Sequence, residues 1–293
     1  MTRSQSWLAH LRTLPDFLVI GAEKCGTTSL YRYLVRHPDV VRASTKEPHF
    51  FDYHWDEGPA WYRAHFPLAV RRTLARRLFG VELRIGEASP DYIFHPHAPE
   101  RVRRLLPRVK LIALLRNPID RAFSHYQQQV RKRRDSLSFE QAIAAEPERV
   151  DGELERLVAD ERHAVHPHVT RFSYLARGRY AEQLERWLGC FDRSRLLVIQ
   201  SEALFATPRA ELARVHAFLA LPGAGRAPDV TDFANENPGE YEAAIRPDTR
   251  RRLAEYFAPH NRRLYALLGT DLGWDVVQSD PRLHLGSESE ASV

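Results

Sequence analysis

Short runs of apolar residues alternate with longer amphipathic stretches along most of this chain. The apolar runs have the length and aliphatic content of buried strands, and they cover residues 16–20, 81–85, 109–115 and 195–200. The amphipathic stretches repeat their apolar positions with the period of a helix, and they cover residues 27–36, 99–106, 118–134, 174–191, 208–219 and 247–268. Strands that alternate with helices predict an α/β fold in which a central parallel sheet is flanked by helices.

The same pattern predicts a single domain. It contains no internal repeat and no linker rich in proline, glycine or serine that would divide the chain. We therefore predict one domain over residues 15–275, with an N-terminal extension at 1–14 and a disordered tail at 276–293. Residues 146–170 are polar and weakly periodic. We expect them to form a helical or mobile insertion over the functional site.

The sequence shows no membrane span and no secretion signal. Its longest aliphatic stretches are about five residues, whereas a span requires about twenty. Residues 1–14 interleave Trp7 and Leu8 with basic residues, so they lack the unbroken apolar segment of a signal peptide. We expect a cytoplasmic protein.

Disulfide and metal chemistry have little support. The only two cysteines, Cys25 and Cys190, are too few and too far apart for a disulfide framework or a zinc cluster. The histidines form no H-E-x-x-H pair. We predict reduced thiols and no bound metal.

The charge balance indicates an anionic partner. The chain has 43 basic and 38 acidic residues, which gives a formal net charge of +5. Lysine is rare, with Lys24, Lys46, Lys110 and Lys132 as its only occurrences. A lysine inside a glycine-containing loop is therefore informative. A nucleotide, an acidic polymer and a nucleic acid all fit the basic excess, and charge alone does not distinguish them.

The first chemical motif follows the apolar run that ends at residue 20. Lys24 lies between two glycines, and Thr27 and Thr28 open the next helix. Converging backbone N–H groups, a helix N-terminus that the threonines can cap and a lysine charge are the elements of a phosphate-binding loop. The loop is not a Walker A motif, because the lysine precedes Gly26 instead of following it. No Walker B aspartate ends the strand at 111–115, which runs into Arg116. A strand-to-helix turn without a ligand is the alternative.

The second motif is the strand over 110–115 and the helix after it. Arg116 stands where the strand ends, and Ser124 follows about two helical turns later. Arg116 and Ser124 suit a second phosphate at the sheet edge where open α/β sheets bind ligands. Capping and surface charge from Asp120 and Arg121 are the alternative interpretation.

The third motif is the loop over residues 46–52. Glu47 precedes Pro48, which favours an extended backbone and can present the carboxylate as a general base. His49 is a competing candidate for the base. An ordinary surface turn anchored by Phe50 and Phe51 is the alternative.

These three motifs, in this order, resemble sulfotransferases that use 3′-phosphoadenosine 5′-phosphosulfate (PAPS). The segments 46–52, 86–92 and 256–265 resemble more narrowly the heparan sulfate glucosaminyl N- and 3-O-sulfotransferase branch and its bacterial relatives. The similarity spans about residues 15 to 275. It implies a P-loop-like nucleotide-binding fold and a PAPS-dependent sulfotransferase.

The resemblance also implies roles for individual residues. Lys24 contacts the bridging oxygen of the leaving bisphosphate, and Glu47 is the catalytic carboxylate. His49 and Tyr92 are candidate acceptor contacts. The remaining cofactor-binding residues are Cys25, Gly26, Thr27 and Thr28 around the 5′-phosphate, and Arg116 and Ser124 at the 3′-phosphate. No metal is implied.

The sequence departs from that branch at two places. Ala88 follows Glu87 where the branch commonly has a lysine, and residues 237–241 stand in place of a late basic loop that covers the cofactor. The expected acceptor is a hydroxyl or amine, with a carbohydrate favoured and a small molecule or lipid hydroxyl as the alternative. A P-loop-type kinase and a basic nucleic-acid-binding module are more distant alternatives. N- versus O-sulfation and the oligomeric state stay open.

Overall fold

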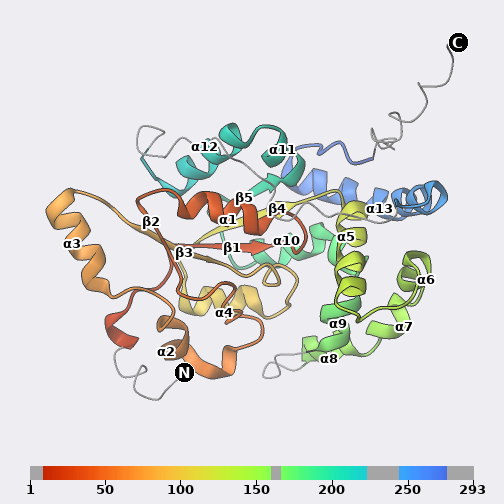
Figure 1. Cartoon of the computed structure of the whole chain (residues 1–293), viewed down its shortest axis with the longest axis horizontal. Coiled ribbons are helices and arrows are strands. Elements are labelled where there is room, and N and C mark those ends of the chain that lie inside the picture. The colour runs from red at the N-terminus through yellow and green to blue at the C-terminus, as the bar shows by residue number, and fades with distance from the viewer. Residues whose placement is uncertain (1–8, 160–165, 223–243, 276–293) are drawn as a thin grey trace, which may run out of the picture.

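The computed structural model describes residues 9–159, 166–222 and 244–275. Its centre is a five-stranded parallel sheet in the order β2-β3-β1-β4-β5 (Figure 1). The predicted α/β fold with a central parallel sheet is confirmed. The strands are β1 (Phe17–Gly21), β2 (Val40–Arg42), β3 (Arg84–Ala88), β4 (Lys110–Leu115) and β5 (Leu196–Gln200).

The central strands β1 and β4 are continuously apolar because they are covered on both faces. Every residue of β1 is buried, and so is every residue of β4 after Lys110. β1 pairs with β3 on one side and with β4 on the other, so that Leu18 lies between Glu87 and Leu111. A parallel strand in this position has no solvent side. The two strands therefore form the middle of the hydrophobic core.

Helices lie on both faces of the sheet. α1 (Thr27–Val35) and α12 (Pro208–Leu219) cover one face, and α4 (Ala98–Leu105) and α10 (Tyr180–Leu188) cover the other (Figure 1). The rings of His37, just after α1, and His216 of α12 are in contact, with centroids 5.1 Å apart. On the opposite face, the indole N–H of Trp187 donates to the carbonyl of Ile93, just before α4.

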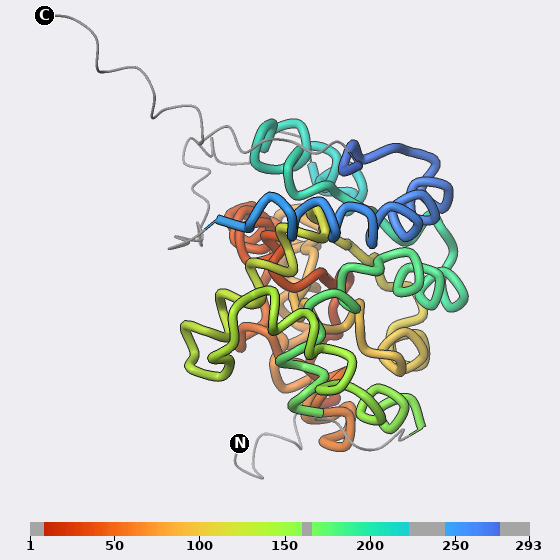
Figure 2. The backbone as a smooth tube through the Cα atoms, turned by 90° about the vertical axis from the view of Figure 1, so that its right-hand side faces the viewer, coloured from red at the N-terminus to blue at the C-terminus, as the bar shows by residue number. Residues whose placement is uncertain are grey.

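Two further helices border the end of the sheet that faces the viewer in Figure 2. They are α5 (Pro118–Arg131) and α13 (Pro247–Leu268), and an ion pair of 2.7 Å between Asp120 and Arg250 joins them. The remaining helices are α2 (Gly58–Arg63), α3 (Ala69–Phe79), α6 (Phe139–Ala144), α7 (Glu146–Val150), α8 (Glu153–Ala159), α9 (Pro167–Phe172) and α11 (Ser201–Ala206).

The chain changes direction across the sheet at β1. It first moves to β2 and β3 on one side, and then crosses to β4 and β5 on the other. Such a reversal leaves a crevice outside the carboxyl ends of the two strands that flank it, and ligands bind there. The segments that follow β1 and β4 meet at this crevice.

The strand predicted at 81–85 begins three residues late. The structure has β3 at Arg84–Ala88, while Val81 directly follows Gly80, the C-cap of α3. Gly80 has φ 64°, and the N–H of Val81 donates to the carbonyl of Ala75. A left-handed glycine with this bond is a common helix ending. The hydrophobic pattern does not indicate the arginine-rich helix α3. The apolar residue that follows this helix was therefore assigned to the strand.

The prediction of a single helix over residues 174–191 is also wrong for the residues before Tyr180. A 3₁₀ turn at Ala176–Gly178 precedes α10. Gly178 packs on the ring of Phe257 so closely that a Cβ there would lie 2.7 Å from it. Arg177 is buried and pairs with Asp91. These contacts join distant parts of the chain, so no local pattern encodes the turn.

The described residues of the segment 146–170 lie mostly in short helices, in agreement with the helical insertion expected there. They contain α7, α8 and the first part of α9, and Thr170 and Arg171 reach the pocket described below. Residues 160–165 lie outside the described residues, as do the expected tail and the segment 237–241. Of the expected N-terminal extension, Ala9–Leu11 forms a 3₁₀ turn in which Ala9 is buried.

Both cysteines are free thiols, with Cys25 buried and Cys190 partly exposed. Cys190 follows α10, where its N–H donates to the carbonyl of Trp187. Among the described residues, no helix has the length and apolar character needed to cross a membrane.

The close contact between β1 and β3 gives a test of the core. A Cβ on Gly86 would lie 2.2 Å from the ring of Phe17, so Gly86→Ala should lower the free energy of unfolding by about 1–3 kcal/mol. Gly189→Ala is the control, because its Cβ would meet only ordinary contacts at 3.5 Å and its φ of −68° suits alanine. Chemical denaturation measures both variants. Equal stability of the two would contradict this packing.

Candidate active site

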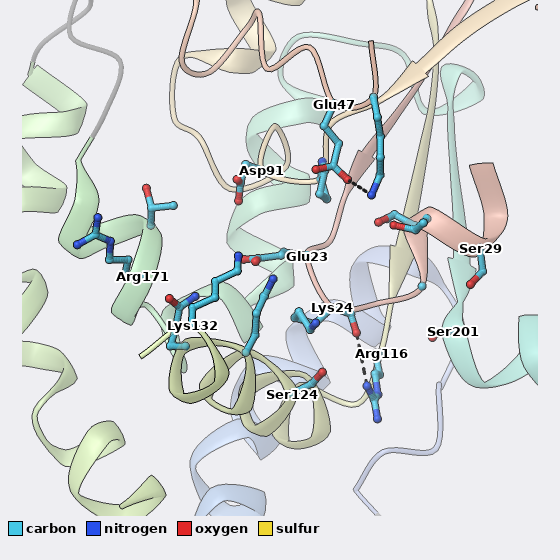
Figure 3. A pocket seen from close by; sticks show the side chains of 18 of the residues that line it. Glu23, Lys24, Ser29, Glu47, Asp91, Arg116, Ser124, Lys132, Arg171 and Ser201 are labelled. Carbon is cyan, nitrogen blue, oxygen red and sulfur yellow. Dashed lines mark hydrogen bonds and ion pairs between the residues drawn. The ribbon is translucent and has the colours of Figure 1, made fainter. Parts of the chain in front are cut away.

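A pocket of about 600 Å³ opens at the crevice between β1 and β4 (Figure 3). Its walls come from segments that follow β1, β3, β4 and β5, together with α5, α9 and the loop after β2. Eight of the residues singled out in the sequence line it: Lys24, Gly26, Thr27, Thr28, Glu47, His49, Arg116 and Ser124. The structure therefore brings the three motifs to one place.

The loop between β1 and α1 turns its backbone toward this pocket. Lys24 and Gly26 both have left-handed φ values, 70° and 88°. A side chain at Gly26 would also collide with Phe205, since a Cβ would lie 2.9 Å from its ring. Gly26 is the N-cap of α1, and no side chain caps the helix, in contrast to the capping expected from Thr27 and Thr28. The N–H groups of the first turn therefore face the pocket with the positive end of the helix dipole, which suits an anion.

Lys24 lies in a crowded positive environment. Burial lowers its pKa, Glu23 opposes that shift, and nearby cations that include Arg116 and Lys132 lower the pKa further. A lysine that is both desolvated and repelled gains most from an anion placed among these cations. The pocket is thus electrostatically suited to a phosphate-like group.

The end of β4 is tied to the Lys24 loop. The guanidinium of Arg116 donates to the carbonyl of Lys24 at 3.5 Å, and the hydroxyl of Tyr180 donates to the carbonyl of Arg116 at 2.9 Å. Ser124 lies further along α5 and lines the same pocket. The two segments that were expected to bind phosphates therefore share one cavity.

The alternative interpretation of the second motif does not agree with the structure. The N-cap of α5 is Asn117, whose side chain accepts from the N–H of Ile119 at 3.0 Å. Asp120 pairs with Arg250 of α13, and Arg121 is fully buried and donates to the carbonyl of Tyr174. Neither charged residue is an isolated surface group.

Glu47 lies across the pocket from Lys24 and Arg116 (Figure 3), in a strained loop that also brings His49 to the pocket. Their φ values are 52° and 51°, in the left-handed region that is costly for residues with a side chain. Such outliers concentrate at functional sites, where the surrounding structure enforces them. The extended backbone predicted for Glu47 before Pro48 is therefore wrong, although its carboxylate does reach the pocket.

The loop carries a chain of charges. His49 Nδ1 lies 2.8 Å from Asp52 Oδ2, His49 Nε2 lies 3.9 Å from Glu47 Oε2, and Lys46 Nζ lies 3.3 Å from Glu47 Oε1. Burial disfavours the charged imidazole, but the bonds to Asp52 and Glu47 outweigh it and raise the pKa of His49 to about 11. Burial raises the pKa of Glu47, but His49 and Lys46 more than offset this and lower it. At neutral pH, Glu47 is a carboxylate and His49 a cation.

Arg101 also supports this loop. It is not among the residues that the sequence motifs singled out. It lies in α4 near Arg103 and Arg104, and a group of arginines on one helix usually indicates a solvated face. Arg101 is only 4% exposed, and it donates to the carbonyls of Phe51 and Asp52 at 2.9 and 3.2 Å. The helical period could have placed Arg101 on the buried side of α4, but not its partners fifty residues away.

A second support comes from the end of β3. The hydroxyl of Ser89 accepts from the N–H of His49 at 3.1 Å and donates to Glu87 Oε2 at 2.9 Å. The other oxygen of Glu87 accepts from Tyr62 at 3.1 Å. Burial raises the pKa of Glu87 to about 7, although the hydroxyls of Tyr92, Ser89 and Tyr62 counteract it. Glu87 thus orients Ser89, and Ser89 holds the strained backbone of His49.

Two proposed site residues lie outside the pocket. The thiol of Cys25 is buried in the core, 3.7 Å from the hydroxyl of Tyr180, and its N–H donates to the carbonyl of Ala22. Tyr92 is also fully buried, and its hydroxyl accepts from the N–H of Phe50 at 2.9 Å. The structure makes Cys25 a core residue and Tyr92 a support of the loop, because burial leaves neither side chain an exposed surface.

One group of three side chains within the described residues has the spacing of a metal site. Ligand atoms of His49, Asp52 and Asp91 lie within 4.8 Å of one another. Each is already engaged, since Asp52 bonds to His49 while Asp91 accepts from Arg177 and from Tyr53. The guanidinium of Arg177 beside Asp91 would repel a metal ion. This donor set fits a hydrogen-bonded support better than a metal centre.

Comparison with known proteins decides the family. The family model of the sulfotransferase domain matches residues 14–235. The chain belongs to the sulfotransferase family. The predicted family and enzyme class, a PAPS-dependent sulfotransferase, are thereby confirmed.

Individual relatives agree with this sulfotransferase assignment. The chain is 34% identical over 287 residues to human heparan sulfate glucosamine 3-O-sulfotransferase 6, covering 90% of this chain and 74% of the relative. It is 32% identical over 285 residues to human bifunctional heparan sulfate N-deacetylase/N-sulfotransferase 3, covering 87% of this chain and 30% of the relative. A solved sulfotransferase from Alicyclobacillus acidocaldarius is 33% identical with a TM-score of 0.64, covering 90% of this chain and all of that one.

The hydrogen-bonded support of the sulfotransferase loop can be tested at Glu87. Glu87→Gln places an amide donor beside Ser89 and disturbs the hydroxyl that holds His49, so kcat for sulfuryl transfer should fall by about tenfold or more. Affinity for the nucleotide should change little. Tyr62→Phe is the control, because it removes a hydrogen bond from Glu87 without touching Ser89.

Hydrogen exchange gives a readout for this support that does not require an acceptor. The amides of residues 49 and 50 should exchange faster in Glu87→Gln and in Ser89→Ala, but not in Tyr62→Phe. Equal exchange in all three variants would show that Glu87 does not act on the loop.

Proposed function

We propose that this sulfotransferase transfers the sulfuryl group of PAPS to a hydroxyl or amine of an anionic carbohydrate. One observation carries the proposal: two anion-binding segments lie side by side on one wall of the pocket, and an ionised glutamate faces them across it (Figure 3). PAPS carries two separated phosphate groups with the sulfuryl group on one of them. The donor and the base are therefore on opposite sides of the reacting sulfur.

The donor side uses fixed groups of the chain. Gly26, Thr27 and Thr28 at the N-terminus of α1 bind the 5′-phosphate, and Arg116 with Ser124 binds the 3′-phosphate. Lys24 contacts the bridging oxygen that leaves with the bisphosphate. Negative charge develops on this oxygen in the transition state, and the lysine neutralises it. These donors neutralise the charge without a metal ion, so we propose metal-independent transfer.

The acceptor side supplies the base. As the acceptor oxygen or nitrogen forms its bond to sulfur, the bond between sulfur and the bridging oxygen breaks, and the acceptor proton passes to Glu47. The lowered pKa of Glu47 keeps it ionised and ready. His49 is already protonated between Glu47 and Asp52, so it orients Glu47 and is not the base.

The proposed acceptor class is supported by the cations that line the pocket and by the names of the relatives. Four cations beyond the donor contacts line the cavity: Lys46, Lys132, Arg134 and Arg171. Such a lining favours an acceptor that carries carboxylate or sulfate groups. The human relatives named for heparan sulfate support a glycan.

Mass spectrometry tests the acceptor class. The full chain is incubated with PAPS and a panel of acidic glycans, neutral sugars, phenols and lipids, and each product is searched for an added sulfuryl group. Modification of an acidic glycan is the expected result. Transfer only to a phenol or lipid would replace the carbohydrate with the alternative acceptors.

Binding of the product adenosine 3′,5′-bisphosphate should raise the melting temperature by about 5 °C or more, with EDTA present throughout. Arg116→Ala should lose most of this shift, whereas Arg251→Ala, on the exposed face of α13, should retain it. Thermal unfolding with and without nucleotide provides the measurement. A larger shift with Mg-ATP than with the bisphosphate would favour a kinase instead.

Glu47 and Lys24 should fail differently when they are replaced. Glu47→Gln should keep nucleotide affinity and lower kcat by roughly a hundred- to ten-thousand-fold, as expected when a general base is lost. Lys24→Ala should reduce both kcat and nucleotide affinity, because the lysine contacts the donor before and during reaction. Because the pKa of Glu47 is lowered, the base should stay ionised until the pH drops through that lowered value, where wild-type kcat should fall.

His49→Asn provides the comparison for the base, measured in the same kcat and affinity assays. Near-normal kcat in Glu47→Gln with a collapse in His49→Asn would reverse the assignment of these two residues.

A further inference from the structure

Helix α3 stands apart from the rest of the molecule. It projects beyond the β2 edge of the sheet, on the side away from α5 (Figure 1). None of its residues is buried. It also contributes no residue to the pocket. The catalytic function therefore does not account for this helix.

A helix of this length needs a covering surface to be stable. Its 11 residues are fewer than an isolated helix requires in water, and most helical stability in proteins comes from packing an apolar face. Its attachment to the body includes the ion pair between Arg72 and Asp16 at 2.6 Å and some packing of Ala75 against the core. The outward face of α3 has no comparable cover among the described residues.

That outward face is apolar. Val70, Leu74 and Leu78 repeat every four residues, which places them along one stripe of the helix. They are 56%, 48% and 67% exposed, and Phe79 at the end of the helix is 72% exposed. Exposed large apolar side chains are ordinary when single, but four on one short helix indicate a contact surface.

Positive charge borders the apolar stripe. The helix contains four arginines and no acidic residue. Arg72 and Arg76 have acidic partners in Asp16 and Glu82. Arg71 and Arg77 follow Val70 and precede Leu78, so they lie on either side of the stripe and are exposed. The surface is thus an apolar strip between cations.

This combination selects one occupant. A second copy of the chain would bring two sets of arginines together, and their repulsion opposes such a dimer. An acidic glycan would pair with the arginines but leave the leucines and Phe79 in water. An anionic lipid surface satisfies both, because acyl chains receive the apolar side chains while headgroup phosphates receive the guanidinium groups.

We propose that α3 docks this sulfotransferase on an anionic lipid bilayer, with Val70, Leu74 and Leu78 inserted at the interface and Arg71 and Arg77 at the headgroups. The pocket is lined by other elements, so docking leaves it open to donor and acceptor. This inference does not depend on the identity of the acceptor.

Vesicle co-sedimentation of the full chain tests the proposal. The wild-type protein should bind vesicles of phosphatidylcholine with phosphatidylglycerol, and should bind pure phosphatidylcholine at least about tenfold more weakly. Leu74→Gln with Leu78→Gln should lose most of the binding, because glutamine keeps the helix but not the apolar face. Arg71→Gln with Arg77→Gln should weaken binding by about twenty-fivefold, since each arginine contributes about fivefold at an anionic surface.

A matched control separates local from general charge effects. Arg251→Gln with Arg252→Gln removes the same charge from the exposed face of α13, and its vesicle binding should remain within about twofold of wild type. Melting temperature and nucleotide binding, measured for every variant, should match wild type, because the substituted side chains are exposed and none of them lines the pocket.

Three outcomes would overturn the proposal. The first is that wild-type protein fails to bind anionic vesicles. The second is that the leucine variant binds them as well as wild type, which would show attraction to the headgroups alone or through another surface. The third is that sedimentation reveals self-association abolished by the leucine variant, which would make α3 an interface between copies of this chain.

Discussion

The position of β1 between β3 and β4 is the constraint on which the site depends. Because the strands are parallel and the chain leaves β1 in one direction and returns to β4 in the other, the segments after both strands end at one crevice. Lys24 and Arg116 are neighbours only for this reason, although more than ninety residues separate them. The same edge receives the end of β3, which carries Ser89 and Asp91. A short apolar strand at the centre of the sheet thus determines which charges meet.

Charge is sorted across the resulting pocket. Cations that include Lys24 and Arg116 gather where the strands β1 and β4 end, and burial together with the neighbouring cations lowers the pKa of Lys24. On the facing wall, the imidazolium of His49 lies between two carboxylates and is stabilised by both. The positive charges of the first wall therefore favour an anionic ligand, whereas the charges of the second wall neutralise one another. The proposed donor and acceptor sides of the pocket rest on this asymmetry.

The sequence predicted those parts of the site that are encoded locally. A strand, a glycine loop and a helix start follow one another around Gly26, and the fold class and family follow from such patterns. Contacts between distant segments left no local signal, as with Arg101 beneath the loop or the buried hydroxyl of Tyr92. Cys25 was included because it lies inside the motif, but its side chain points into the core. The cytoplasmic location, the domain limits and the roles of the site residues stay predictions.

The left-handed backbone at Lys24, Glu47 and His49 sets the stability of this enzyme against its activity. At such φ values, glycine is the substitution that most easily relieves strain and raises stability. At these three positions, it would also delete the charged groups that the pocket is built around. Selection for a more robust fold and selection for turnover therefore oppose each other here, and stabilising substitutions for engineering are better sought elsewhere in the chain.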